Sequence, residues 1–270
     1  MGWLQAAVMG LVEGITEFLP ISSTGHLILA GELLDFERTI GGEQAAKAFD
    51  IFIQLGAILA VVVAYPRRFG RLANLAADGG FAGWRGLALL VLTTLPGALL
   101  AVALQKQIKE HLFSSLSVAI GAAVGAVWIL AVERWRPRVR REGLDALTWR
   151  DALAVGLFQC FALWPGMSRA GATILGGMMV GIDRRTATEY SFFAAVPLLC
   201  GAAVYELAKN YRDLQGAQLT LFAVGLVASF VFAFLAVKWL LHFVGTHTLR
   251  PFAWYRLALA AAVLCWWWWR

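Results

Sequence analysis

The sequence predicts an all-α polytopic membrane protein, built as an inverted-topology repeat with six full transmembrane helices and two re-entrant or broken helical segments. Hydrophobic residues make up 60% of the 270 residues and charged residues only 15%, against about 45–50% and about 25% in soluble domains. One broken segment followed by three apolar spans occurs twice, which predicts the repeat. The net charge of +6 does not indicate nucleic-acid binding, because the basic residues lie in short loops, where they set membrane topology.

Six apolar runs are long enough to cross a hydrocarbon core about 30 Å thick. Short polar loops separate them, so each run is expected to be one membrane-spanning helix. The predicted spans lie near 49–65, 86–104, 116–132, 186–208, 219–241 and 252–269.

The charge of the loops predicts the orientation of the spans. The loops at 66–85 and 133–150 are rich in arginine, whereas the loop at 105–115 carries two lysines and one glutamate. The positive-inside rule therefore places the two arginine-rich loops in the cytoplasm and the 105–115 loop outside. The loop at 209–218 and both termini are then expected on the outer side.

Segments 1–35 and 151–182 do not fit as full spans, because Pro, Gly and hydroxyl residues interrupt their apolar sequence. Each precedes three ordinary spans. We therefore expect a single integral membrane domain over 1–270, with a first repeat at 1–135 and a second, inverted repeat at 150–270. Non-helical backbone inside a membrane is tolerated only where it is buried in protein or lines a wet cavity.

The two broken segments can be aligned with one another. An offset of 145 residues places Pro20 on Pro165 and Ser23 on Ser168. Because each repeat has an odd number of spans, the second must enter the membrane from the opposite face. This is the plan of inverted repeats whose broken helices meet near the midplane.

The first motif, Glu13–His26, contains two carboxylates. Glu13 and Glu17 are four residues apart, so they share a helix face. In a low dielectric, two close carboxylates cannot both stay charged and unpaired, so either one is protonated or a cation lies between them. Ionisable groups at this depth indicate a functional site. The other polar members of the motif are Ser22, Ser23, Thr24 and His26.

The same motif predicts an anion site. Pro20 is expected to end the first helix, and any of the three hydroxyl residues can cap a new helix starting near Gly25. The N-terminus of that helix is a seat for phosphate, and His26, three residues after Ser23, is within reach of the same anion. The alternative is that the hydroxyls bond back to carbonyls four residues earlier and that the glutamates are structural.

The second motif, Trp164–Thr173, repeats this arrangement. Pro165 is expected to stop one helix, Ser168 to cap the next, and Arg169 to stand at its N-terminus. An arginine beside a positive helix end is unfavourable unless an anion is present, and its planar fork suits bidentate phosphate binding. An ion pair with one of the two glutamates of the first motif is the alternative, and the two readings do not exclude each other.

Other polar residues lie in apolar stretches. Asp50 and Gln54 come early in the span after the first motif. They either join the site or bond between helices, and the sequence favours neither. Gln159 and Glu189 are in a similar position.

The two motifs closely resemble the two signatures of the bacterial undecaprenyl-pyrophosphate phosphatases of the BacA/UppP type. The resemblance covers essentially the whole chain, including Asp50…Gln54-Leu-Gly and Glu189-Tyr-Ser-Phe. It implies a hydrolase that removes the terminal phosphate of undecaprenyl pyrophosphate, which recycles the lipid carrier for peptidoglycan synthesis and is associated with bacitracin resistance. It also implies a divalent cation, Mg²⁺ or Ca²⁺, and a multi-pass protein of the bacterial cytoplasmic (inner) membrane with its active site toward the periplasm.

Carried onto this chain, the resemblance implies Glu13 and Glu17 as metal-linked or acid/base carboxylates. It implies Ser23 or His26 as the nucleophile, with the other assisting or binding phosphate, and the sequence does not decide between them. Arg169 is expected on phosphate. The other expected phosphate-binding residues are Ser22, Thr24, Ser168 and Thr173, and weaker site candidates are Asp50, Gln54, Gln159 and Glu189.

One departure from the family pattern is visible. The family commonly reads PG-x-SRSG, whereas this chain has Met167 at the variable position and Ala170 in place of the second Ser. One hydroxyl that would face phosphate is therefore missing.

Two other functions compete with the phosphatase. A lipid flippase or transporter can share the inverted-repeat architecture, but translocation alone does not require a nucleophile, an arginine and carboxylates together. The other class of membrane lipid phosphatases is disfavoured, because no His follows Ser168-Arg169 at the required spacing. The expected partners are the prenyl diphosphate and membrane lipid, and the oligomeric state is left open, a homo-oligomer included.

Overall fold

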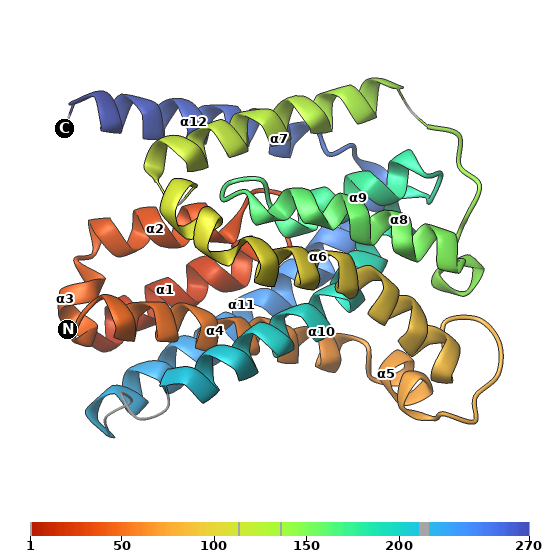
Figure 1. The fold of residues 1–270 in the computed structure, drawn as a ribbon, viewed down its shortest axis with the longest axis horizontal. Helices are drawn as coiled ribbons and strands as arrows, with labels where there is room; N and C mark the ends of the chain where they lie inside the picture. The colour runs from red at the N-terminus through yellow and green to blue at the C-terminus, as the bar shows by residue number, and fades with distance from the viewer. Residues whose placement is uncertain (1, 113, 136, 211–215, 270) are drawn as a thin grey trace. The chain divides into compact units, whose positions relative to one another are not determined.

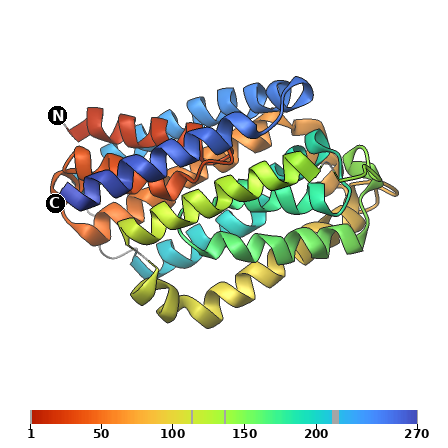
Figure 2. The same ribbon diagram turned by 90° about the horizontal axis from the view of Figure 1, so that it is seen from above.

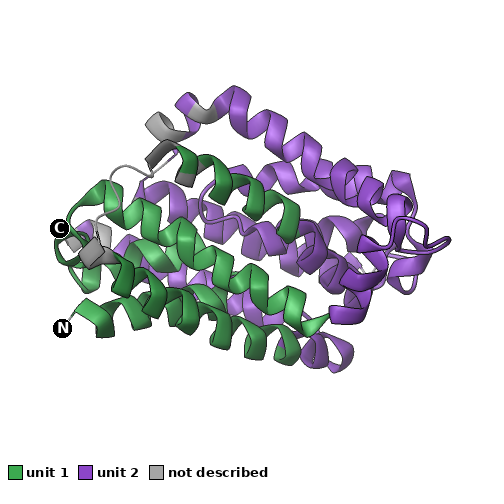
Figure 3. Cartoon of the chain, turned by 90° about the horizontal axis from the view of Figure 1, so that it is seen from below, with its two compact units in different colours: residues 1–19, 23–65, 195–239 green, residues 20–22, 66–194, 240–270 purple. Residues whose placement is uncertain are grey.

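A computed structural model describes residues 2–112, 114–135, 137–210 and 216–269 (Figure 1). Within these ranges the secondary structure is helical, apart from turns and one isolated bridge between Arg141 and Ile182. The predicted all-α class is therefore confirmed. The chain forms two compact units (Figure 3): residues 1–19, 23–65 and 195–239 make unit 1, and residues 20–22, 66–194 and 240–270 make unit 2.

Unit 1 contains the N-terminal helices together with parts of two long helices from the second half of the chain. Its helices are α1 (Gly2–Thr16), α2 (Ser23–Leu33), α3 (Phe36–Ile40), α4 (Glu43–Ala64), the C-terminal part of α10 (Arg184–Asn210) and most of α11 (Gly216–Thr246).

Unit 2 contains the central helices and the last helix. Its α-helices are α5 (Pro66–Ala73), α6 (Gly83–His111), α7 (Ser115–Trp135), α8 (Trp149–Gln159), α9 (Arg169–Met179), the first part of α10, the end of α11 and α12 (Arg250–Trp269). Two short 3₁₀ helices flank α8: Leu144–Ala146 precedes it and Cys160–Leu163 follows it.

Five helices in the described part of the chain are long and apolar enough to cross a membrane. They match the first five predicted spans and cover 43–64, 83–104, 116–135, 184–205 and 219–246. The sixth predicted span coincides with α12, which is not among these five, so its crossing stays a prediction. Residues 211–215 of the predicted outer loop at 209–218 lie outside the described residues.

Both broken segments are confirmed. Segment 1–35 folds as α1 and α2, separated by the turn at 17–22, and segment 151–182 folds as α8, the 3₁₀ turn Cys160–Leu163 and α9. Each first helix ends earlier than its proline predicts, at Thr16 and at Gln159. After Gln159 the backbone tightens into a 3₁₀ helix, a common way to end an α-helix.

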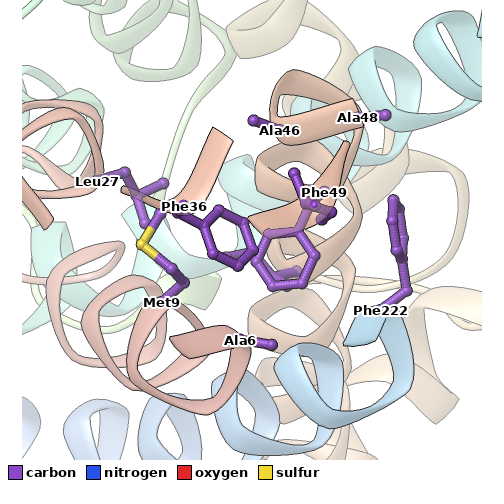
Figure 4. Packing of buried hydrophobic residues seen from close by; sticks show 10 residues of the cluster. Ala6, Met9, Leu27, Phe36, Ala46, Ala48, Phe49 and Phe222 are labelled. Atoms are coloured by element: carbon purple, nitrogen blue, oxygen red, sulfur yellow. The ribbon is translucent and has the colours of Figure 1, made fainter. Parts of the chain in front are cut away.

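Aromatic packing in unit 1 holds α1 against its neighbours (Figure 4). Met9 of α1 and Leu27 of α2 belong to the same buried cluster as Phe36, Phe49 and Phe222. The ring centroids of Phe36 and Phe49 are 4.8 Å apart, and those of Phe49 and Phe222 are 5.4 Å apart. Buried aromatic pairs at these distances stabilise a helix interface beyond the area that they bury. The cluster therefore helps to fix α1, which carries Glu13.

Small residues also bring α1 close to α11 within unit 1. A Cβ at Gly14 would lie 2.5 Å from the carbonyl oxygen of Ser229 and 2.8 Å from the nitrogen of Ala233. A Cβ at Gly10 would overlap the carbonyl oxygen of Gly225. Close backbone approach through small residues is the usual way in which helices associate in lipid.

In unit 2, α7 lies beside α12 and α6 beside α8, and α9 packs against both α7 and α8 (Figures 1 and 2). Polar bonds join the first part of α10 to α6 and α7. The Tyr190 hydroxyl is 2.6 Å from the Thr93 hydroxyl, and the Arg184 guanidinium donates to the buried Glu133 carboxylate at 2.6 Å. Within lipid, such polar side chains stay buried only when they are hydrogen-bonded or paired.

The two arginine-rich loops meet at one end of unit 2. Arg68 donates to the Asp145 carboxylate at 3.0 Å, and the backbone N–H of Phe81 donates to the same carboxylate at 2.7 Å. Partial burial alone would raise the pKa of Asp145, but the Phe81 N–H and the Arg68 guanidinium lower it below the ordinary value. Both loops therefore lie on the same side of the spans, as the positive-inside rule requires.

Candidate active site

The two glutamates of the first motif are buried, Glu13 on α1 and Glu17 directly after its last residue. Glu13 is fully buried and Glu17 is 6% exposed. The backbone N–H of Glu17 donates to the carbonyl of Glu13 at 2.9 Å, so helical geometry continues to this residue and the two carboxylates lie one turn apart. Their prediction as neighbours on one helix face is confirmed, and their burial inside an apolar helix bundle favours a functional role.

Ser23 is the first residue of α2, and its hydroxyl bonds to the second of these glutamates. Its Oγ donates to Oε2 of Glu17 at 2.6 Å. This length is at the short end of the range for O–H···O hydrogen bonds. The alternative in which Ser23 merely bonds back to a carbonyl is not what the structure shows, whereas Thr16 does so, at 2.7 Å to Val12. A hydroxyl on a carboxylate acceptor is the arrangement of a nucleophile with its base.

The other residues of the first motif lie around this bond in the sequence and differ in exposure. His26 is half-buried on the first turn of α2, three residues after Ser23, and Thr24 is exposed. Ser22, directly before α2, is 5% exposed. The helix starts at Ser23, two residues before the expected Gly25, so its free N–H groups come from the motif itself.

The second motif caps α9 as predicted. Ser168 is the N-cap residue, and its Oγ accepts a hydrogen bond from the N–H of Gly171 at 3.1 Å. Arg169 follows as the first residue of the helix and is half-buried. A cation at the positive end of a helix is electrostatically unfavourable by itself. This placement therefore favours an anion as the natural ligand of the turn.

Arg169 is oriented by a residue that the sequence did not single out. Its Nη1 donates to the carbonyl of Ser191 at 2.9 Å and to the Ser191 hydroxyl at 3.2 Å. The Ser191 hydroxyl is also 2.7 Å from that of Thr173, which in turn donates to the carbonyl of Arg169 at 2.9 Å. These bonds form a closed ring within unit 2. The sequence signal for Ser191 is its place in the Glu189-Tyr-Ser-Phe stretch, which gives no indication of its contact with Arg169.

This ring changes the expectation for Thr173. The side chain is 1% exposed and its hydroxyl is engaged with Ser191 and with helix carbonyls. Its position beside Arg169 is as predicted, but the geometry gives it a supporting contact to the arginine. Direct phosphate binding by Thr173 stays a prediction.

The two turns share an unusual backbone conformation. Ser22 has φ 74° and Ser168 has φ 71°, and each directly precedes a half-helix. Among the described non-glycine residues, only Asp35 also has positive φ. Left-handed backbone at such residues costs about 1–3 kcal/mol and is concentrated at functional sites. By this criterion the turns correspond at Ser22 and Ser168, which are 146 residues apart, one more than the offset read from the sequence.

Two of the weaker candidates serve the fold or face elsewhere. Gln159 is buried, and its Nε2 donates to the carbonyl of Thr93 at 3.1 Å, which ties α8 to α6. Glu189 is half-buried on α10, two residues before Ser191. Residues two apart leave a helix about 200° from one another, so Glu189 does not point toward the Arg169 ring.

Asp50 and Gln54 lie one turn apart on α4, in unit 1. Oδ1 of Asp50 is buried and has no hydrogen-bond partner among the described residues. Gln54 is half-buried. The role of Asp50 and Gln54, in the site or between helices, therefore stays a prediction.

Glu13 and Glu17 are the carboxylates of the first motif that could hold a divalent cation, and the cation stays a prediction. Within the described residues, no group of three or more His, Cys, Asp and Glu side chains is arranged to hold a metal ion. Mg²⁺ is usually bound by one or two carboxylates together with substrate phosphate oxygens and water. Glu13 and Glu17 supply that donor set, whereas a closed cage made only of protein side chains is not indicated.

Helical structure throughout the described residues and several apolar spans define a polytopic membrane protein, and a half-buried serine bonded to a buried carboxylate lies at the start of one half-helix. The chain belongs to the family described as bacitracin resistance protein BacA, whose sequence model matches residues 6–262.

Three similar proteins have the same name. A protein named undecaprenyl-diphosphatase from Nitratidesulfovibrio vulgaris is 52% identical over 260 residues, 96% of each chain. Proteins of the same name from Oleidesulfovibrio alaskensis and Cupriavidus necator are 50% and 49% identical. The matches cover 97% of both chains for the first, and 97% of this chain and 94% of the relative for the second.

Proposed function

We propose that this chain is an undecaprenyl-diphosphate phosphatase, an integral membrane hydrolase that converts undecaprenyl pyrophosphate to undecaprenyl phosphate and inorganic phosphate. The relatives named undecaprenyl-diphosphatase over nearly the full chain support the activity. The single structural observation that carries the mechanism is the 2.6 Å bond from Ser23 Oγ to Glu17 Oε2. The reaction regenerates the monophosphate lipid carrier used in peptidoglycan synthesis, and by removing the pyrophosphate form it opposes bacitracin.

Ser23 is the proposed nucleophile. Its Oγ attacks the terminal phosphorus in line with the bridging oxygen, while Glu17 accepts the hydroxyl proton. The phosphoanhydride bond breaks, undecaprenyl phosphate leaves with the proton that Glu17 had accepted, and Ser23 carries the phosphoryl group. Water then attacks that phosphorus and gives one proton to the ionised Glu17. Glu17 returns this proton to Ser23 Oγ as the Oγ–P bond breaks, which releases inorganic phosphate and restores the serine hydroxyl. His26 is the alternative nucleophile, but Ser23 already has its proton acceptor in place.

The proposed phosphate contacts use backbone and arginine. The N–H groups in the first turns of α2 and α9 and the guanidinium of Arg169 suit the phosphate oxygens, whose charge increases as the anhydride breaks. Ser191 and Thr173 hold that guanidinium in place. Ser22, Thr24 and Ser168 are the remaining proposed phosphate neighbours.

Glu13 and Glu17 would hold a Mg²⁺ or Ca²⁺ ion. Such an ion neutralises charge on the phosphoryl group that is transferred. The buried position of both carboxylates supports this role, because a cation relieves the repulsion of two close carboxylates in a low dielectric.

The proposed location is the bacterial cytoplasmic membrane, with the active site toward the periplasm. The meeting of the two arginine-rich loops at one end of unit 2 supports a common cytoplasmic side for them. A lipid flippase, the competing function, has no observation in its favour.

The decisive experiment measures phosphate release from undecaprenyl pyrophosphate by the purified protein in detergent, with Mg²⁺ present. The wild type is expected to release phosphate, and the Glu17→Gln variant, equally folded, to release almost none. Lipid transfer between vesicle leaflets without phosphate release by the wild type would instead establish the flippase.

A further inference from the structure

Arg256 is a fully buried arginine with no part in the proposed chemistry. It lies in α12, within unit 2, and is the largest fully buried side chain among the described residues. A buried guanidinium is costly unless its donors are satisfied. All five of its N–H groups donate to backbone carbonyls: Nε to Ala122 at 3.1 Å, Nη1 to Pro20 and Met167 at 3.0 Å each, and Nη2 to Gly121 at 3.1 Å and Gly166 at 3.0 Å.

Three of these carbonyls belong to the two broken-helix turns. Pro20 lies in the turn before α2, and Gly166 and Met167 lie in the turn before α9. In both turns the backbone leaves the helical conformation, so these carbonyls have lost their usual helical donors. Backbone that is not helical is tolerated in a membrane only where other groups satisfy it. Arg256 supplies those donors to both turns from a single side chain.

The fold keeps a space for this guanidinium. α7 lies beside α12 (Figure 1), and Gly125 of α7 faces the arginine. A Cβ at Gly125 would overlap Nη2 of Arg256, and a Cβ at Gly171 would lie 3.3 Å from Nη1. A side chain at Gly125 would therefore displace the guanidinium from the carbonyls.

We infer that Arg256 is a positioning residue for the phosphatase reaction. By holding the carbonyls of Pro20, Gly166 and Met167, it sets the two strained turns that end at Ser22 and Ser168. The two turns position the N-termini of α2 and α9, which bind phosphate in the proposed function. The inference therefore rests on that function. The planar, five-donor guanidinium is required, because an ammonium has three donors in a different geometry.

The test compares Arg256→Lys with the wild type, using undecaprenyl pyrophosphate as substrate. A shift of about 1 Å in a catalytic group can cost about 100-fold in rate, so kcat is expected to fall about 100-fold while KM stays close to the wild-type value. Arg184→Lys is the matched control. It weakens another guanidinium contact, that of Arg184 with the buried Glu133, and touches neither turn, so kcat should be retained.

A second variant separates positioning from folding. Gly125→Ala keeps Arg256 but displaces its guanidinium, and it should lower kcat in the same way. Each kcat is measured well below the melting temperature of that variant, on protein that is monodisperse by size exclusion. Wild-type kcat in either folded variant overturns the inference, as does loss of the fold in both variants, which would make Arg256 purely structural. An inactive wild type would instead refute the proposed function.

Discussion

The Ser23 hydroxyl donates a 2.6 Å hydrogen bond to Oε2 of Glu17, across the turn that separates α1 from α2. This bond joins a hydroxyl at a half-helix N-terminus to a carboxylate that is only 6% exposed. Neither group needs to move far for proton transfer, because a general base lies about 2.6–3.2 Å, heavy atom to heavy atom, from the group whose proton it accepts. The bond therefore supports the proposed roles of Ser23 as nucleophile and Glu17 as base.

Removing the base should abolish most turnover. Glu17→Gln keeps the size of the side chain but cannot accept the proton as a carboxylate does, so kcat should fall about 10²–10⁴-fold. Ser23→Ala should lose at least as much. The control is Glu43→Gln, which neutralises an exposed carboxylate at the start of α4 in the same unit. Near-normal phosphate release by Glu17→Gln would show that the carboxylate is not the base.

Removing the hydroxyl that orients Arg169 should have a smaller effect. Ser191→Ala deletes one acceptor of Nη1 but leaves the backbone carbonyl of residue 191 in place. Since a single hydrogen bond contributes about 0.5–1.5 kcal/mol, kcat/KM should fall about 3- to 10-fold. Ser229→Ala is the comparison, because that buried hydroxyl has no hydrogen-bond partner among the described residues. Equal activities in the two variants would show that the Ser191 hydroxyl does not orient Arg169 for the reaction.

Removing divalent cations should stop the reaction. EDTA is expected to abolish phosphate release, and added Mg²⁺ or Ca²⁺ to restore it, since the proposed cation is shared between the carboxylates and the substrate. Glu13→Gln should raise the cation concentration that gives half-maximal activity. Full activity of the wild type in excess EDTA would contradict the cation proposal while leaving the serine mechanism intact.

The packing of α1 on α11 should be sensitive to one methyl group. Gly14→Ala would bring a Cβ to 2.5 Å from the carbonyl oxygen of Ser229, and overpacking of this kind costs about 1–3 kcal/mol. The melting temperature in detergent should fall. Gly201→Ala is the matched helical control, because a Cβ there meets nothing within 4 Å. If both variants melt at the same temperature, the close approach at Gly14 is not important for stability.

Much of the fold followed from hydropathy and from helix breakers. Five spans and both broken segments were predicted because each is a local property: a long apolar run, or an apolar run interrupted by Pro and hydroxyl residues. The ends of α1 and α8 were less well predicted. α1 stops at Thr16 and α8 at Gln159, each several residues before its proline, because turn geometry and packing decide where a helix ends.

The site was predicted in part, and the reason is distance along the chain. Glu17 and Ser23 are six residues apart, so one motif contains both. The partners of Arg169 and Arg256 are not local: Ser191 is 22 residues from Arg169, and Pro20 is 236 residues from Arg256. No spacing rule connects such residues, and a serine or an arginine in an apolar helix gives no indication of which carbonyls or side chains it will meet.

Trapping the phosphoenzyme and mapping the labelled residue tests most directly whether Ser23 attacks the phosphorus with Glu17 as base. Wild-type protein is mixed with undecaprenyl pyrophosphate labelled at its terminal phosphate, quenched within one turnover, and digested for mass spectrometry under conditions that preserve both phosphoserine and phosphohistidine. Label is expected on Ser23 in the wild type, with little or none in the Glu17→Gln variant. Label on His26 in the wild type would contradict this expectation.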